Sequence, residues 1–137
     1  MLEKIDHIGI AVRDLDEAIK RYTLLMAAPP AHLEEVPTQQ VKVAMFNVGA
    51  SRVELLAATS PESAIAKFLD KRGEGLHHLC FRVDDLAAAL ARVQAGGMEV
   101  VAGAGTAGAG GSRVAFLHPR SAAGVLIELV EHKQAGS

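Results

Sequence analysis

The sequence repeats itself, and this repeat limits what the chain can fold into more than any other feature. The segment LHHLCFRVDDLAAAL (residues 76–90) matches IDHIGIAVRDLDEAI (residues 5–19) at a constant offset. Two further pairs of segments match in the same order: KVAMF (42–46) with RVAFL (113–117), and VELL (53–56) with IELV (127–130). Agreement in order at three places indicates that the chain is built from two copies of one module.

Each copy shows the pattern of a strand, a helix and three further strands. In the first copy apolar residues alternate along residues 6–12, and Asp14 is the expected N-cap of a helix. Three strands are expected to follow, at 31–36, 41–48 and 51–57. The second copy predicts, in the same order, a strand at 75–83, a helix at 85–95 and strands near 98–102, at 112–118 and at 123–131. The pattern predicts an α+β fold with two tandem βαβββ modules.

We expect the whole chain, residues 1–137, to form a single domain. Its predicted parts are a first module at about 3–58, a linker helix at about 60–73 and a second module at about 74–132. Residues 103–111 are too small and too rich in glycine for a strand, which predicts a mobile loop that closes over a site.

Alternation along the strands separates two neighbouring histidines. Successive residues of a strand point to opposite faces of the sheet, so His77 shares the apolar face with Leu79, and His78 does not. The same argument places four potential ligands on the faces away from the helices: His7, Glu54, His78 and Glu128. A lone histidine on a strand is more often a structural residue, but two imidazoles and two carboxylates related by a repeat are typical ligands of a divalent metal ion.

The remaining histidines and the cysteine carry weaker signals. We expect His77 to pack or to support a ligand, and His118, near a strand end, is a minor candidate for contact with a substrate. His32 and His132 are expected on the surface. Cys80 is expected to fill a small space in the core rather than to act as a nucleophile.

Composition excludes several classes of function. The chain has 14 Lys and Arg against 16 Asp and Glu, and aromatic residues make up only 4%, so we do not expect nucleic-acid binding. The single cysteine excludes an intramolecular disulfide and is typical of a reducing compartment. Because the sequence lacks the apolar core of a signal peptide and any stretch typical of a membrane span, we expect a cytoplasmic protein without membrane association.

Three segments of the chain resemble a known family. They are IDHIGIAVRDLDEAIKRY (5–22), SAIAKFLDKRGEGLHH (63–78) and the ending FLHP…GVLIEL (116–129). These segments resemble the vicinal oxygen chelate superfamily of glyoxalases, bleomycin resistance proteins and dioxygenases, and within it the methylmalonyl-CoA epimerases. The resemblance implies that the two modules form an open β-cup around a metal site. The implied metal ligands are His7, Glu54 (a glutamine in some members), His78 and Glu128.

The resemblance also implies an activity, namely interconversion of (R)- and (S)-methylmalonyl-CoA. The proton next to the thioester would be removed through a metal-stabilised enolate, with Co²⁺, Mn²⁺, Ni²⁺ or Mg²⁺ as candidate ions. Glu128 is favoured as one catalytic base, and the other is either Glu54 or a water molecule on the metal ion. The expected partners are a small acyl-CoA substrate and a second copy of the chain in a homodimer.

The sequence departs from the family pattern at three places. Some members carry a catalytic glutamate where this chain has Val43, relatives usually have Glu-Pro where it has Ala57-Ala58, and many have an acidic loop at 103–111. Val43 therefore leaves the second acid/base open. The alternatives are a glyoxalase I-like lyase or isomerase, an extradiol dioxygenase and a non-catalytic ligand-sequestering protein. The fourth ligand argues against the dioxygenase, and retention of all four argues against the sequestering protein.

Overall fold

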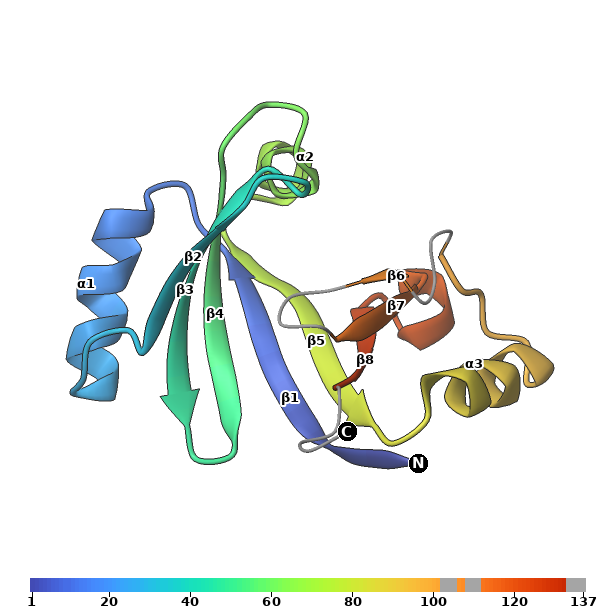
Figure 1. Ribbon diagram of the computed structural model, residues 1–137. Coiled ribbons are helices and arrows are strands. Elements are labelled where there is room, and N and C mark those ends of the chain that lie inside the picture. Colours follow the sequence, from blue (N-terminus) through green and yellow to red (C-terminus); the bar gives the residue numbers. More distant parts are fainter. Residues whose placement is uncertain (102–105, 108–111, 133–137) are drawn as a thin grey trace. The chain divides into compact units, whose positions relative to one another are not determined.

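The computed structural model describes residues 1–101, 106–107 and 112–132 (Figure 1). The chain divides into two compact units. The N-terminal unit comprises residues 7–77, and the C-terminal unit comprises residues 1–6 and 78–137. Strand β1 (Leu2–Ala11) and strand β5 (Gly75–Val83) each contribute residues to both units.

The N-terminal unit is a four-stranded sheet with two helices. Besides β1 it contains α1 (Leu15–Met26), β2 (His32–Val36), β3 (Val41–Val48), β4 (Ser51–Ala58) and α2 (Ala64–Arg72). The strand order is β2-β3-β4-β1. Strand β3 is antiparallel to β2 and β4, and β1 runs parallel to β4.

The two helices of this unit cover opposite faces of its sheet. Asp14 is the N-cap of α1, as predicted, and its side chain accepts a hydrogen bond from the backbone N–H of Glu17. Figure 1 shows α1 beside the sheet. Its apolar side packs against alternate residues of β3 and β4, including Phe46 and Leu55. Helix α2 packs through Ile65 and Leu69 on the other face, against a second cluster: Ala11, Val41, Val43 and Leu56.

The C-terminal unit repeats the same plan. It contains residues 78–83 of β5, then α3 (Leu86–Ala95), β6 (Thr106–Ala107), β7 (Arg113–Leu117), a 3₁₀ helix (Pro119–Ala122) and β8 (Leu126–Glu131). The strand order is β5-β8-β7-β6, with β8 parallel to β5 and antiparallel to β7. Read from its other end, this is the order of the N-terminal unit, with β5, β6, β7 and β8 in the places of β1, β2, β3 and β4.

Helix α3 covers one face of the C-terminal sheet. Asp85 is its N-cap and accepts a hydrogen bond from the backbone N–H of Ala88, as Asp14 does in the other unit. The apolar residues on this face form one cluster with the helix: Val83, Leu86, Ala89, Ala115 and Leu129. The predicted α+β class with two βαβββ modules is confirmed.

One predicted strand is wrong, and one strand was missed. Near 98–102 the described chain makes only a single bridge, between Val100 and Leu117. The extra strand is β6, inside the segment that we predicted to be too rich in glycine for a strand. Two residues suffice there because β6 needs only backbone pairing with β7. The rest of the predicted lid, 103–105 and 108–111, lies outside the described residues.

No helix in the part of the chain that the structure describes has both the length and the apolar character needed to cross a membrane.

Candidate functional site

A histidine and a glutamate lie together on the sheet of the N-terminal unit. His7 is on β1 and pairs with Arg52 of the adjacent strand β4, and Glu54 lies two pairs further along the same register. Nδ1 of His7 lies 3.5 Å from Oε2 of Glu54, and each side chain is 9% exposed. Both project from the face opposite helix α1, because the α1 cluster takes the alternate residues, such as Leu55.

Arg52 holds the carboxylate of Glu54. Its Nε and Nη2 atoms donate to Oε2 of Glu54 at 3.2 and 2.9 Å. The two residues are two positions apart on β4 and therefore share a face. Because both hydrogen bonds reach one oxygen, they fix the orientation of the carboxylate and leave its other oxygen, Oε1, outside this clamp.

The C-terminal unit holds an equivalent pair. His78 on β5 and Glu128 on the adjacent strand β8 approach to 3.2 Å between Nε2 and Oε1. The two side chains are 9% and 11% exposed. Phe116 of β7 lies directly across from Glu128, and its ring is perpendicular to that of His78, with centroids 6.4 Å apart. The sequence prediction that each histidine and glutamate share a face is met in both units.

The two pairs have the chemistry of metal ligands. A buried carboxylate is costly unless it is paired, hydrogen-bonded or bound to a metal ion. An imidazole beside a carboxylate offers the mixed nitrogen and oxygen donors that suit first-row divalent ions. The donor set therefore fits the ion that the sequence implied. That all four side chains bind one ion stays a prediction.

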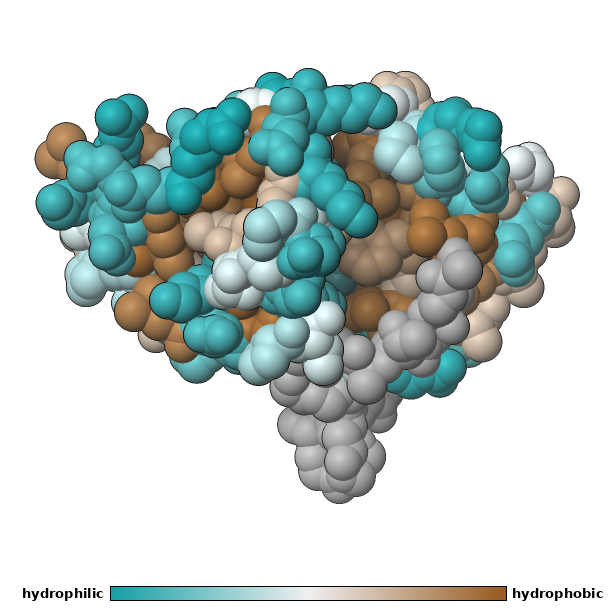
Figure 2. Space-filling model, turned by 90° about the horizontal axis from the view of Figure 1, so that it is seen from above, coloured by the Kyte–Doolittle hydropathy of each residue, from teal (hydrophilic) through white to brown (hydrophobic). Residues whose placement is uncertain are grey.

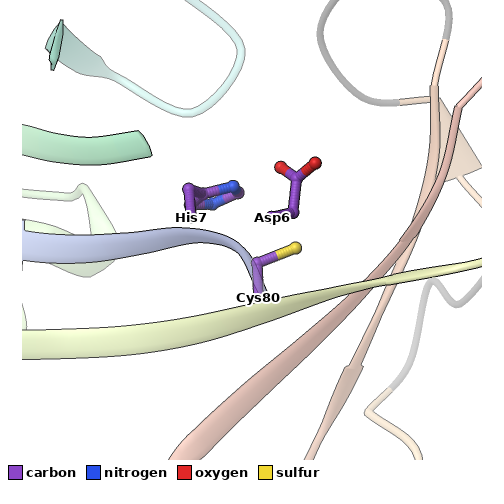
Figure 3. A group of neighbouring side chains, drawn as sticks. All are labelled: Asp6, His7 and Cys80. Carbon is purple, nitrogen blue, oxygen red and sulfur yellow. The ribbon is translucent and has the colours of Figure 1, made fainter. Parts of the chain in front are cut away.

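His132 is partly exposed, and its imidazole also contacts a buried carboxylate that the sequence did not predict. Its Nε2 lies 2.9 Å from Oδ1 of Asp6, which is only 2% exposed. Asp6 precedes His7 on β1. The sulfur of Cys80, a carboxylate oxygen of Asp6 and a ring nitrogen of His7 lie within 4.8 Å of one another (Figure 3). Cys80 is fully buried with Val114 and Val130, as expected for a core residue. Sequence reasoning missed the His132–Asp6 contact because its partners are 126 positions apart.

The other histidines have structural contacts. His77 packs edge-on against Phe68 of α2, with ring centroids 4.9 Å apart, as a packing residue should. His118 caps the 3₁₀ helix, because its Nδ1 accepts a hydrogen bond from the backbone N–H of Arg120 at 3.1 Å. His32 is exposed, as predicted, and its Nε2 lies 3.2 Å from Oε1 of Glu34.

A cavity of about 460 Å³ lies elsewhere in the N-terminal unit. It is lined by residues near the start of α1, among them Arg13, Arg21, Tyr22 and Glu74. Arg13 is already engaged there, because its backbone N–H donates to Glu74 and its guanidinium donates to the carbonyl of Leu69. Neither His7 nor Glu54 lines this cavity.

Comparison with known proteins gives a consistent picture. The model of the Glyoxalase/Bleomycin resistance protein/Dioxygenase superfamily matches residues 6–116. An ethylmalonyl-CoA/methylmalonyl-CoA epimerase of Cereibacter sphaeroides is 35% identical over 131 residues, which are 94% of this chain and 98% of that protein. A lactoylglutathione lyase of Escherichia coli O157:H7 is more distant, at 26% identity over 130 residues.

Solved structures of methylmalonyl-CoA epimerases are also similar to this chain. The methylmalonyl-CoA epimerase of Mycobacterium tuberculosis is 41% identical, with a TM-score of 0.89 over 97% of this chain and 90% of that one. The enzyme of Streptomyces coelicolor, solved as a variant in complex with 2-nitronate-propionyl-CoA, is 38% identical. Its TM-score is 0.90, and the match covers 98% of this chain and all of that one.

Proposed function

The chain belongs to the glyoxalase/bleomycin resistance protein/dioxygenase superfamily, and we propose that it is a methylmalonyl-CoA epimerase, which interconverts the (R) and (S) forms of its substrate. The observation that carries this proposal is the duplicated His–Glu pair, one in each unit, in a chain 35 to 41% identical to epimerases over most of its length. The sequence-based identification of the family is confirmed.

We propose that His7, Glu54, His78 and Glu128 together bind one divalent metal ion. The support is the donor set: two imidazole nitrogens and two carboxylates, all nearly buried and all on the sheet faces that the repeat relates. When bound, such an ion supplies Lewis-acid stabilisation of the negative charge that develops on the thioester oxygen. Co²⁺, Mn²⁺, Ni²⁺ and Mg²⁺ remain the candidates.

We propose Glu128 as one catalytic base. The hydrogen on the α-carbon is only weakly acidic, so the carboxylate that removes it has to lie within about 3 Å of it. Glu128 is held in place by its contact with His78, and the neighbouring ring of Phe116 is apolar and limits water. Its carboxylate accepts the α-proton and later returns a proton to the α-carbon in the reverse reaction.

Glu54 is the sequence-based candidate for the second acid/base, and its clamp by Arg52 favours the ligand role instead. Both hydrogen bonds from Arg52 end on Oε2 and fix the orientation of the carboxylate, as the ligand role requires. Only Oε1, which lies outside this clamp, would be left to exchange a proton. Val43 offers no replacement, because it is an apolar residue buried in the α2 cluster.

The proposed substrate is an acyl-CoA, and the proposed assembly is a homodimer. The support for the substrate is similarity to the enzyme solved with an acyl-CoA analogue.

The support for the homodimer is apolar side chains exposed on the surface. Figure 2 shows hydrophobic side chains exposed among hydrophilic ones, and Leu24, Leu25 and Leu33 are 85, 72 and 60% exposed. Sedimentation equilibrium should give twice the chain mass of 14.4 kDa; a monomer would contradict the dimer.

The proposed activity is tested by supplying the epimers separately. A coupled mutase that consumes only one epimer should use the other one only when this protein is present. The glyoxalase alternative is tested with the hemithioacetal of methylglyoxal and glutathione, which should turn over poorly. No epimerisation together with efficient turnover of the hemithioacetal would reverse the assignment.

A further inference from the structure

The contacts that Arg52 and His7 make with Glu54 converge on one carboxylate oxygen. Nε and Nη2 of Arg52 donate to Oε2 at 3.2 and 2.9 Å, and Nδ1 of His7 lies 3.5 Å from the same atom. A carboxylate has a second, equivalent acceptor, which here is Oε1. The side chain can therefore accept from Arg52 through one oxygen while the other oxygen binds a further partner.

These three residues lie on one face of the sheet in the N-terminal unit. His7 pairs with Arg52 across the parallel β1–β4 ladder, and Glu54 is two positions further along β4. The Glu54 side chain is 9% exposed, and that of Arg52 is 30% exposed. A nearly buried carboxylate is costly without a partner. Arg52 compensates this cost, because its guanidinium is permanently charged.

We propose, on the basis of the metal site proposed above, that Arg52 is a positioning residue that leaves Oε1 of Glu54 as the metal-binding atom. Two donors on one oxygen restrict the rotation of the carboxylate more than the ammonium group of a lysine could. The positive charge also offsets that of the carboxylate, so Glu54 offers an oxygen donor with little net charge. An outer hydrogen-bond partner of a metal ligand contributes about 10- to 100-fold to metal affinity.

This arrangement requires a glutamate rather than a glutamine at position 54. The side chain of glutamine has a single oxygen, and its other terminal atom is an amide nitrogen that donates hydrogen bonds. In Glu54→Gln, Arg52 and a metal ion therefore compete for one oxygen. Removing Arg52 from this variant ends the competition. The effect of losing Arg52 on metal affinity should therefore change sign between the wild type and Glu54→Gln.

The experiment is a double-mutant cycle on metal affinity. Mn²⁺ is titrated calorimetrically into the metal-free wild type, Arg52→Met, Glu54→Gln and the variant that carries both substitutions. Lys42→Met is the matched control, because it removes a cation from the same sheet. Lys42 pairs with Ala57 of the α1 cluster and therefore lies on the opposite face. Denaturant unfolding of the metal-free proteins verifies that each is folded.

Arg52→Met should lower the affinity for Mn²⁺ about 10- to 100-fold. Glu54→Gln should lower it as well, and the variant with both substitutions should bind Mn²⁺ about 10-fold or more tightly than Glu54→Gln. Arg52→Lys keeps the charge without the fork of donors, so it should show a smaller loss than Arg52→Met. Lys42→Met should bind Mn²⁺ like the wild type.

Three outcomes would overturn the inference. One is wild-type affinity for Mn²⁺ in Arg52→Met. Another is an equal loss when Arg52 is removed from the wild type and from Glu54→Gln, because a purely structural role acts alike in both. The third is Lys42→Met failing like Arg52→Met. A wild-type protein that binds no divalent ion would instead overturn the proposed metal site, and the inference with it.

Discussion

Nε2 of His78 lies 3.2 Å from Oε1 of Glu128, whereas the ring of the preceding residue, His77, packs against Phe68. Two consecutive histidines therefore have different surroundings, because adjacent residues of a strand leave it on opposite sides. One is placed to bind a metal ion beside a carboxylate. The other stabilises the contact between β5 and α2.

The two alanine substitutions should therefore fail in different ways. His78→Ala removes a proposed ligand, so metal affinity should fall by more than the roughly 10- to 100-fold that loss of an outer hydrogen-bond partner causes. His77→Ala removes an edge-to-face contact and should cost about 1 kcal/mol of unfolding free energy. Isothermal titration with metal and denaturant unfolding measure the two effects. Loss of metal binding in His77→Ala beside normal binding in His78→Ala would contradict the site.

Glutamine substitutions should separate a base from a ligand. Glu128→Gln keeps the shape and an oxygen donor but cannot accept the α-proton, so turnover should fall about 10²- to 10⁴-fold while some metal remains bound. Glu54→Gln is the matched control, because it changes the other ligand carboxylate, and it should weaken metal binding with a smaller loss of turnover. Steady-state rates at saturating metal compare the two. Unchanged turnover in Glu128→Gln would move the proton transfer to another residue.

The contact between His132 and Asp6 should contribute to stability. Asp6 is 2% exposed, so removing an imidazole that touches its carboxylate should cost roughly 1–3 kcal/mol of unfolding free energy in His132→Ala. His32→Ala is a fitting control, since it removes a histidine–carboxylate contact at an exposed pair, where the effect should be about 0–1 kcal/mol. Urea unfolding would measure both. Equal unfolding free energies of the two variants would contradict a larger contribution from the buried contact of His132 with Asp6.

The ion pair of Arg120 and Glu99 should be visible in a titration. The hydrogen bond from the Arg120 guanidinium holds the pKa of Glu99 below its ordinary value, against the opposing effect of desolvation. The lowered pKa means that the pair stabilises the fold above the ordinary pKa of a glutamate and that this contribution disappears as pH falls through the lowered value. In Arg120→Gln the Glu99 carboxyl, followed by NMR, should titrate at higher pH. An unchanged titration would contradict the assigned cause.

Much of the fold follows from the repeat and from side-chain alternation. Both depend on local rules, and so the helix starts at Asp14 and Asp85 and the shared face of His7 and Glu54 could be predicted. The strand near 98–102 could not be excluded, because an apolar stretch there favours a strand and only tertiary pairing shows that Val100 makes a single bridge.

The parts of the site that escaped prediction depend on contacts that no local pattern encodes. The clamp of Arg52 on Glu54 needs the rotamers of two long side chains. The contact of His132 with Asp6 joins the two ends of the sequence.

The most direct measurement of the central claim follows the α-carbon itself. Wild-type protein loaded with a divalent metal ion is incubated with a single epimer of methylmalonyl-CoA in D₂O, and the substrate is analysed by mass spectrometry. We expect one deuterium at the α-carbon and growth of the opposite epimer, both abolished when a chelator removes the metal. Deuterium incorporation no faster than without protein, with metal supplied, would contradict the account.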